Sequence, residues 1–150
     1  MNATVTRHPV RLAIFSTPDH LCVVRAAAET LCRKMGFDDA GITKVVLSVD
    51  EALTNVIRHA YGGAEDQPIE VELSAGLEEG DVALRVRVRD FGRYAGACEV
   101  QPREPSALRP GGLGVYIMHE CMDRVEYRQA EGGGTLLTMT KRLSAPRGGS

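Results

Sequence analysis

The sequence predicts an α/β (α+β) two-layer sandwich, and three observations predict it. Periodicity and turn residues divide the chain into strand, helix, helix, strand, strand, long loop, helix, strand and strand, in that order. The helical stretches carry their apolar residues on one side. One strand alternates between apolar and polar residues. Elements with one apolar side bury it by stacking in layers, here helices on a sheet.

A strand and a helix are expected first. Residues 10–16 form the strand, and Thr17 then supplies a helix N-cap. Pro18 falls in the first helical turn, where its missing N–H costs little. Apolar residues recur at helical spacing as far as Met35, and Gly36 follows as a residue that ends helices.

The most regular helix is expected at residues 39–61. Its apolar residues share one face: Val45, Val46, Val49, Ala52, Leu53, Val56, Ile57 and Ala60. Away from that face, Glu51, Asn55 and His59 recur every four residues as a polar stripe. Because asparagine is a mediocre helix former, this stripe faces either solvent or a ligand. Spacing alone favours solvent.

Two strands are expected next, at residues 69–75 and 82–90, joined by a turn at 78–80. Apolar residues alternate with other residues along the second strand: Val82, Leu84, Val86 and Val88. Asp90 is in phase with them and is expected on the core side. An unpaired buried charge is costly, so Asp90 needs either a salt bridge to an arginine or a donor on a ligand. Gly92 permits a close backbone approach.

Prolines and glycines accumulate after residue 91, and a long loop, the candidate lid, is expected at about residues 93–111. A helix at 114–122 and a hairpin of residues 124–129 and 135–142 complete the expected elements.

A glycine cluster, Gly111-Gly112-Leu113-Gly114, lies just before that last helix. Free N–H groups and the helix dipole attract phosphate at such a position. The cluster matches neither the P-loop pattern nor the dinucleotide fingerprint. Taken alone, it leaves a phosphate cradle and a flexible hinge as equal alternatives.

One domain is expected over residues 1–150, with its core at about 10–143 and a frayed tail at 145–150. A chain of this size buries roughly 68–70% of its unfolded surface. Its 43% hydrophobic and 25% charged residues are typical of globular proteins.

Charge and hydropathy exclude two classes of partner. The formal charge of −2 gives no basic excess for nucleic acid. No apolar run reaches the roughly 18 residues of a membrane span, and residues 1–9 lack a secretory signal. A cytoplasmic protein without nucleic-acid or membrane partners is expected.

The four cysteines have no metal-ligand spacing: Cys22, Cys32, Cys98 and Cys121. Three of them lie in expected helices, so buried, reduced thiols are expected.

Taken together and in order, these motifs resemble the GHKL superfamily of ATPases and kinases. The run Glu-Ala-Leu-Thr-Asn-Val-Ile-Arg-His-Ala-Tyr from Glu51 to Tyr61 resembles its N box. Three glycine boxes follow in order: Asp90-Phe91-Gly92, Gly112-Leu113-Gly114 and Gly134-Thr135. The resemblance covers nearly the whole chain. It implies the Bergerat ATP-binding fold, with a mixed, mostly antiparallel sheet covered by helices on one face.

The resemblance also implies ATP and Mg²⁺ as cofactors and gives the polar residues roles. Asp90 would bond the adenine amino group, and Asn55 would ligate the Mg²⁺ that bridges the phosphates. Glu51, the catalytic residue, would orient or deprotonate the acceptor hydroxyl. His59 belongs to the pattern as a packing or hydrogen-bonding residue.

Further contacts with ATP are implied by the glycine boxes. Gly92 belongs to the first box, and the backbone N–H groups near the phosphates would belong to Gly112, Leu113, Gly114 and Val115. Arg109 either reaches the γ-phosphate or is a solvated arginine. Thr135 either supports the adenine end through its hydroxyl or is an ordinary strand residue.

Within the superfamily the motifs are most similar to those of bacterial anti-sigma factor serine/threonine kinases. The implied function is a kinase that phosphorylates a STAS-like anti-sigma-factor antagonist and otherwise binds a sigma factor, as a homodimer. Nucleotide state would select the partner.

Two other functions are weighed against this one. Tyr94 stands two residues after Gly92, where many family members have a second glycine, so the alternative is a regulatory module of the same fold without catalysis, with or without ATP. A histidine-kinase catalytic domain ranks last, because the 150 residues leave no room for a phosphoacceptor helix.

Overall fold

The computed structural model describes residues 8–92 and 112–143, and its elements follow the expected order. They are β1 (Val10–Phe15), α1 (Pro18–Met35), α2 (Asp39–Asn55), the π-helical turn η1 (Val56–Ala60), β2 (Pro68–Glu78), β3 (Asp81–Asp90), α3 (Gly112–Cys121), β4 (Arg124–Gln129) and β5 (Thr135–Arg142). The expected lid, the tail and Cys98 lie outside the described residues, as does Arg109.

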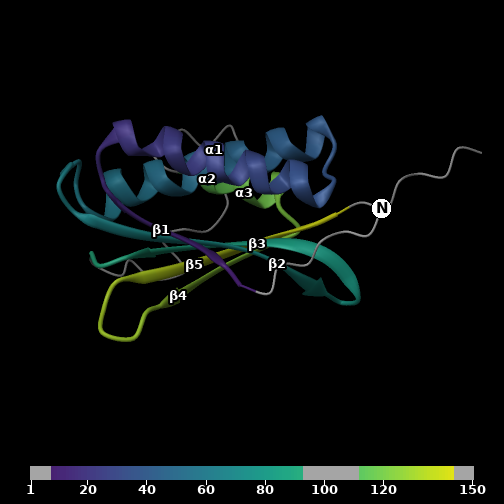
Figure 1. Cartoon of the computed structure of the whole chain (residues 1–150). Helices are drawn as coiled ribbons and strands as arrows, with labels where there is room; N and C mark the ends of the chain where they lie inside the picture. The colour runs from purple at the N-terminus through teal and green to yellow at the C-terminus, as the bar shows by residue number, and fades with distance from the viewer. Residues whose placement is uncertain (1–7, 93–111, 144–150) are drawn as a thin grey trace, which may run out of the picture.

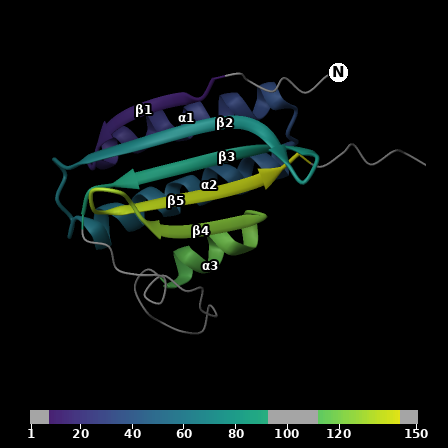
Figure 2. The ribbon, with the colours of Figure 1, turned by 90° about the horizontal axis from the view of Figure 1, so that it is seen from below.

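The five described strands form one sheet in the order β1-β2-β3-β5-β4, which Figure 2 shows from below. All four neighbouring pairs are antiparallel. The register places Ile69 of β2 opposite Asp90, the last residue of β3. The end of the central strand therefore meets the beginning of β2.

The three helices cover one face of this sheet, and Figure 1 shows them above it as a single layer. The helix α2 packs against both α1 and α3. Each central strand sends alternate apolar residues into the core beneath the helices: Val71, Leu73, Val86, Val88, Leu137 and Met139. The expected two-layer sandwich is confirmed.

Helix ends follow the local signals. The helix α1 ends at Gly36, whose left-handed φ of 96° lets its N–H reach the carbonyls of Cys32 and Arg33. The helix α2 begins after Asp38, whose carboxylate accepts the Gly41 N–H at 2.7 Å. Thr17 precedes α1, but its side chain makes no capping hydrogen bond.

The second helix departs from its expected course at its C-terminal end. The α-helical hydrogen bonding stops at Asn55, and residues Val56–Ala60 form one π-helical turn, η1. The Tyr61 N–H closes this turn by donating to the Val56 carbonyl at 3.1 Å. Because a π turn holds more residues than an α turn, His59 no longer follows Asn55 as an α-helical stripe requires, and it is exposed.

The cysteine expectation is right for one residue and wrong for another. Cys32 is buried as a free thiol, and its burial raises its pKa to about 12. Cys22 is exposed because it lies on the outer side of α1, and Cys121 is half-buried.

Among the helices that the structure describes, none is long and apolar enough to span a membrane.

Candidate functional site

Asp90 ends the central strand as a buried carboxylate. It is 4% exposed and shares the core side of β3 with Val86 and Val88, as the alternation predicted. The backbone N–H of Gly92 donates to it at 3.0 Å, and the backbone N–H of Thr135 donates to it as well. Burial raises the pKa of Asp90, although these two donors and the charge of Arg89 oppose the shift.

The sequence left open a structural salt bridge between Asp90 and an arginine, and the described residues form none at Asp90. None of their salt bridges includes this carboxylate. The neighbouring Arg89 places its guanidinium over the Phe91 ring, 4.7 Å from the ring centroid. Backbone donors hold the Asp90 carboxylate in place without a cationic partner in this part of the chain.

Two glycines, Gly92 and Gly134, allow close backbone contacts at the end of β3. A Cβ on Gly134 would overlap the Asp90 carbonyl oxygen and lie 2.9 Å from the Phe91 Cα. A Cβ on Gly92 would overlap the Ala60 carbonyl oxygen of η1. The first and third glycine boxes therefore meet at Asp90, and the first also meets the end of the N box.

Glu51 and Asn55 lie against the beginning of α3. A Cβ on Gly114 would overlap the Glu51 carboxylate and lie 3.6 Å from Asn55 Nδ2. Both polar side chains are half-buried, so they face α3 and not open solvent. Asn55 Nδ2 is buried and has no hydrogen-bond partner among the described residues. A buried amide without a partner is typical of a site that a ligand or water completes.

Three residues of the glycine cluster lie within α3 instead of before it, and Gly111 lies outside the described residues. The helix begins at Gly112 and not at Gly114, so Gly112-Leu113-Gly114 forms its first turn. The first N–H groups of a helix have no intrahelical acceptor, and the helix dipole favours an anion beside them. Val115 is 4% exposed and belongs to the core, so only its backbone can face an anion.

The structure thus brings the expected residues together as two groups. Asp90, Gly92 and Thr135 form one group at the end of β3, whereas Glu51, Asn55 and Gly114 form the other between α2 and α3. The turn η1 links the groups, because it begins directly after Asn55 and its Ala60 carbonyl lies against Gly92.

One residue of this region was not singled out from the sequence. The Tyr61 hydroxyl accepts a hydrogen bond from the Phe91 N–H at 2.7 Å and donates one to the Pro68 carbonyl at 2.6 Å. Its sequence signals were its place at the end of the run that resembles the N box and just before Gly62 and Gly63, which have positive φ angles.

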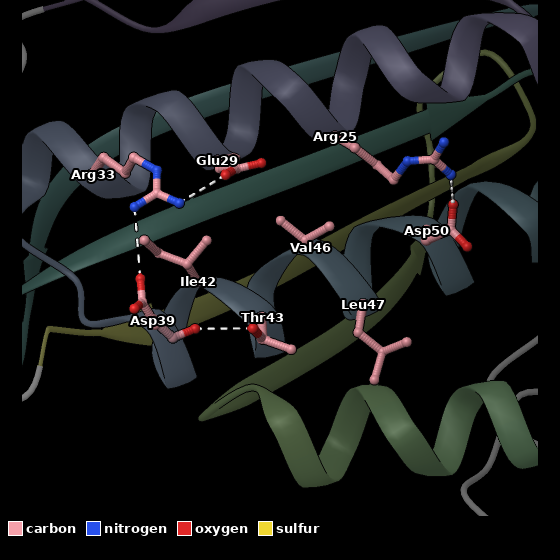
Figure 3. Close-up of a pocket in the computed structure, with 9 residues that line it drawn as sticks. All are labelled: Arg25, Glu29, Arg33, Asp39, Ile42, Thr43, Val46, Leu47 and Asp50. Carbon is pink, nitrogen blue, oxygen red and sulfur yellow. Dashed lines mark hydrogen bonds and ion pairs between the residues drawn. The ribbon is translucent and has the colours of Figure 1, made fainter.

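A separate groove of about 660 Å³ lies between α1 and α2, and Figure 3 shows its lining. Arg25 pairs there with Asp50 at 2.5 Å, and Arg33 pairs with Glu29 at 2.9 Å. None of the expected site residues lines it. The pair between Arg25 and Asp50 joins the two helices and leaves the adjacent Glu51 to the other side of α2.

The polar groups fit a bound nucleotide with a magnesium ion better than a metal held by protein alone. Residues 8–92 and 112–143 contain no cluster of three or more His, Cys, Asp or Glu side chains suited to a metal. Mg²⁺ commonly takes few protein ligands and completes its shell with phosphates and water. The amide of Asn55 beside the start of α3 is suited to such a shared site.

Comparisons with known proteins agree with this geometry. Residues 14–141 match the family described as the histidine kinase-like ATPase domain. The serine-protein kinase RsbW of Bacillus pumilus is 30% identical, with 98% of this chain and 92% of the relative covered. The serine-protein kinase RsbW of Bacillus subtilis is 31% identical, with 92% and 88% covered.

A solved structure supports the same fold. The crystal structure of the RsbU and RsbW domains of Rv1364c from Mycobacterium tuberculosis superposes with a TM-score of 0.64 at 24% identity. The match covers 93% of this chain and 33% of that longer chain. The chain therefore belongs to the histidine kinase-like ATPase domain family and, within it, groups with serine-protein kinases.

Proposed function

We propose that the protein is an ATP-dependent serine/threonine protein kinase whose ATP site extends from Asp90 to the start of α3. The observation that carries this proposal is the buried Asp90 carboxylate, which meets only backbone donors in the described structure. A desolvated carboxylate gains most from a ligand that donates to it. The exocyclic amino group of adenine is such a donor.

The base end of the site is formed by Asp90 and its glycine neighbours. Gly92 and Gly134 bring the surrounding backbone close to the carboxylate, and the N–H groups of Gly92 and Thr135 orient it. The Thr135 hydroxyl is a further contact for the adenine end. This arrangement favours a nucleobase that donates a hydrogen bond to Asp90 over a nucleobase that has an acceptor at the same position.

The phosphate end is formed by α2 and α3. The first N–H groups of α3, from Gly112 to Val115, would receive the phosphate oxygens. Asn55 would supply an amide oxygen to Mg²⁺, which neutralises phosphate charge when bound. Arg109, outside the described residues, is the proposed contact for the γ-phosphate.

Glu51 is the proposed catalytic base. Its carboxylate lies beside Gly114 at the start of α3, where the phosphate end is proposed, and it is half-buried. A carboxylate in that place can orient the acceptor hydroxyl and take its proton as the oxygen attacks phosphorus. Phosphoryl transfer otherwise depends on positioning and charge stabilisation.

The proposed partners are those that the motif resemblance to anti-sigma factor kinases implies, and the relatives are named serine-protein kinases. The acceptor would be a serine or threonine of a STAS-like anti-sigma-factor antagonist. A sigma factor would be the second partner, and the kinase would act as a homodimer. ATP and ADP would favour different partners if the two nucleotide states of the site bind them with different affinities.

Phosphate transfer to a panel of STAS-like antagonists, with labelled ATP and Mg²⁺, tests this function. Acid-stable phosphoserine or phosphothreonine on an antagonist is expected with the wild-type chain. The Glu51→Ala variant should still bind ATP but transfer no phosphate. Acid-labile phosphohistidine would contradict the proposal. A folded chain that binds ATP without any transfer would support the non-catalytic module instead.

A further inference from the structure

The Tyr61 hydroxyl joins three segments that are separate in the sequence. Tyr61 itself follows η1, its acceptor Pro68 begins β2, and its donor Phe91 follows β3. The two hydrogen bonds measure 2.6 and 2.7 Å, which are short and well formed for these atoms. Because a phenol has one proton, the hydroxyl uses that proton on Pro68 and a lone pair on Phe91.

Backbone hydrogen bonds hold Tyr61 in place. Its N–H donates to the Val56 carbonyl at 3.1 Å, and its carbonyl accepts the Ala64 N–H at 3.0 Å. The Gly63 N–H donates to the Ile57 carbonyl at 2.7 Å. The hydroxyl of Tyr61 therefore extends from a fixed backbone.

The loop that follows Tyr61 is anchored to the end of β1. Ser16 is fully buried, and its hydroxyl donates to the Ala64 carbonyl at 2.5 Å and accepts the Gln67 N–H at 3.0 Å. The backbone N–H of Ser16 donates to the Gln67 carbonyl at 2.8 Å. Pro68, the acceptor for Tyr61, directly follows this anchored loop.

The segment Asp90-Phe91-Gly92 is held from the same side at two consecutive residues. The Phe91 N–H bonds the Tyr61 hydroxyl, and Gly92 lies against the Ala60 carbonyl. The Gly92 N–H in turn bonds the Asp90 carboxylate at 3.0 Å. The Phe91 side chain is 46% exposed, so the core does not fix this segment through that ring.

We propose that Tyr61 is a positioning residue for base recognition, which fixes the Phe91 amide and thereby the direction of the Asp90 carboxylate. This inference rests on the proposed ATP site. The carboxylate depends on the Gly92 N–H, and the position of Gly92 depends on the Phe91 peptide that Tyr61 holds. Burial raises the pKa of Tyr61, so the hydroxyl keeps the proton that it donates to Pro68.

The placement of η1 gives this contact a second consequence. Asn55, the proposed Mg²⁺ ligand, directly precedes η1, and Tyr61 directly follows it. One helical turn thus connects the residue for the phosphate end with the residue that orients the base end. In the proposed site, η1 therefore lies between the proposed Mg²⁺ ligand and the residue that positions the base end.

The test compares the Tyr61→Phe variant with a matched control, Tyr127→Phe. Both changes remove one phenol oxygen, but the half-buried Tyr127 lies on β4, and its hydroxyl makes no hydrogen bond within the described residues. Dissociation constants are measured by calorimetry for ATP and for purine riboside 5′-triphosphate, both with Mg²⁺. The second nucleotide has hydrogen in place of the amino group that Asp90 is proposed to bind.

Wild-type chain should prefer ATP, and Tyr61→Phe should weaken ATP about threefold to tenfold, as expected for a net hydrogen-bond contribution. Affinity for purine riboside triphosphate should stay the same, so the preference for ATP falls. Tyr127→Phe should change neither value. Equal weakening of both nucleotides by Tyr61→Phe, or an unchanged preference, would overturn the positioning role.

Two further readouts keep the outcomes distinct. Wild-type chain that binds no ATP would contradict the proposed function, whereas ATP binding with an unchanged preference in Tyr61→Phe contradicts only this inference. Amide hydrogen exchange of Phe91, measured in the wild-type chain, tests the inference even if the Tyr61→Phe variant fails to fold. Protection of that N–H is expected, and exchange at the rate of an unprotected amide would overturn the inference.

Discussion

Gly134 lies so close to Asp90 that a Cβ on the glycine would approach the Asp90 carbonyl carbon to 2.9 Å and overlap its oxygen. Gly134 also has a φ of 78°, in the left-handed region that favours glycine. Two separate requirements for glycine thus coincide beside the buried carboxylate. The β5 strand can pass the end of β3 at this distance because position 134 has no side chain.

Replacing Gly134 with alanine should therefore destabilise the fold through both steric overlap and the backbone conformation. Gly132→Ala is a matched control, because Gly132 has a φ of 85° with no atom within 4 Å of its Cβ position. We expect the control to cost about 1–2 kcal/mol and Gly134→Ala to cost about 1–2 kcal/mol more. Urea unfolding measures both. If both variants lose the same free energy of unfolding, the close contact between position 134 and Asp90 does not affect stability.

Asp90→Asn should weaken ATP binding without lowering stability. The amide oxygen still accepts from Gly92 and Thr135, while the desolvated charge is removed. Because the folded pKa of Asp90 is raised, the folded state holds this proton more tightly than the unfolded state does. Its ionisation therefore lowers the free energy of unfolding as pH rises from about 3.9 through the folded value.

Urea unfolding between pH 4 and 7 checks this sign. The stability of Asp90→Asn relative to wild type should increase over that range as the wild-type carboxylate ionises. Asp81→Asn, at the exposed opposite end of β3, is the control and should affect neither stability nor binding. A variant at Asp90 that is clearly less stable than wild type at pH 7 would show that the charge stabilises the fold.

Much of this site is predictable from local patterns. The alternation along β3 correctly predicts Asp90 on the core side, and Gly36 correctly predicts the end of α1. These features depend on periods of two and 3.6 residues and on capping chemistry, which short segments determine by themselves.

The remaining features depend on contacts between distant segments. The π turn at Val56–Ala60 was not predicted, and its Ala60 carbonyl lies against Gly92, which is distant in the sequence. The hydrogen bonds of Tyr61 were missed for the same reason. Cys22 was wrongly expected to be buried, because it lies in an amphipathic helix but outside the buried face to which its neighbour Leu21 belongs.

Gly114→Ala should impair phosphate transfer with little effect on stability. The new Cβ would overlap the end of the Glu51 side chain, which can rotate away, and alanine favours a helix over glycine by about 1 kcal/mol. Displacement of the catalytic carboxylate should lower the transfer rate by about tenfold or more. Gly76→Ala, whose Cβ position has no atom within 4 Å, should leave the rate unchanged.

Thermal unfolding and the transfer assay together check this prediction. If Gly114→Ala transfers phosphate at the wild-type rate, the position of the Glu51 carboxylate beside α3 is not required for catalysis. A strongly destabilised variant would show that the contact between α2 and α3 is tighter than the flexible Glu51 side chain implies.

Calorimetric titration of ATP, with and without Mg²⁺, tests the central claim most directly when wild type, Asn55→Ala and Asp90→Asn are compared. Wild type should bind ATP more tightly with Mg²⁺, and Asn55→Ala should lose that enhancement. Asp90→Asn should weaken binding about 10-fold to 100-fold under both conditions, because it removes a charge-assisted hydrogen bond. Failure of the folded wild-type chain to bind ATP, or wild-type affinity in Asp90→Asn, would contradict a nucleotide site between Asp90 and α3.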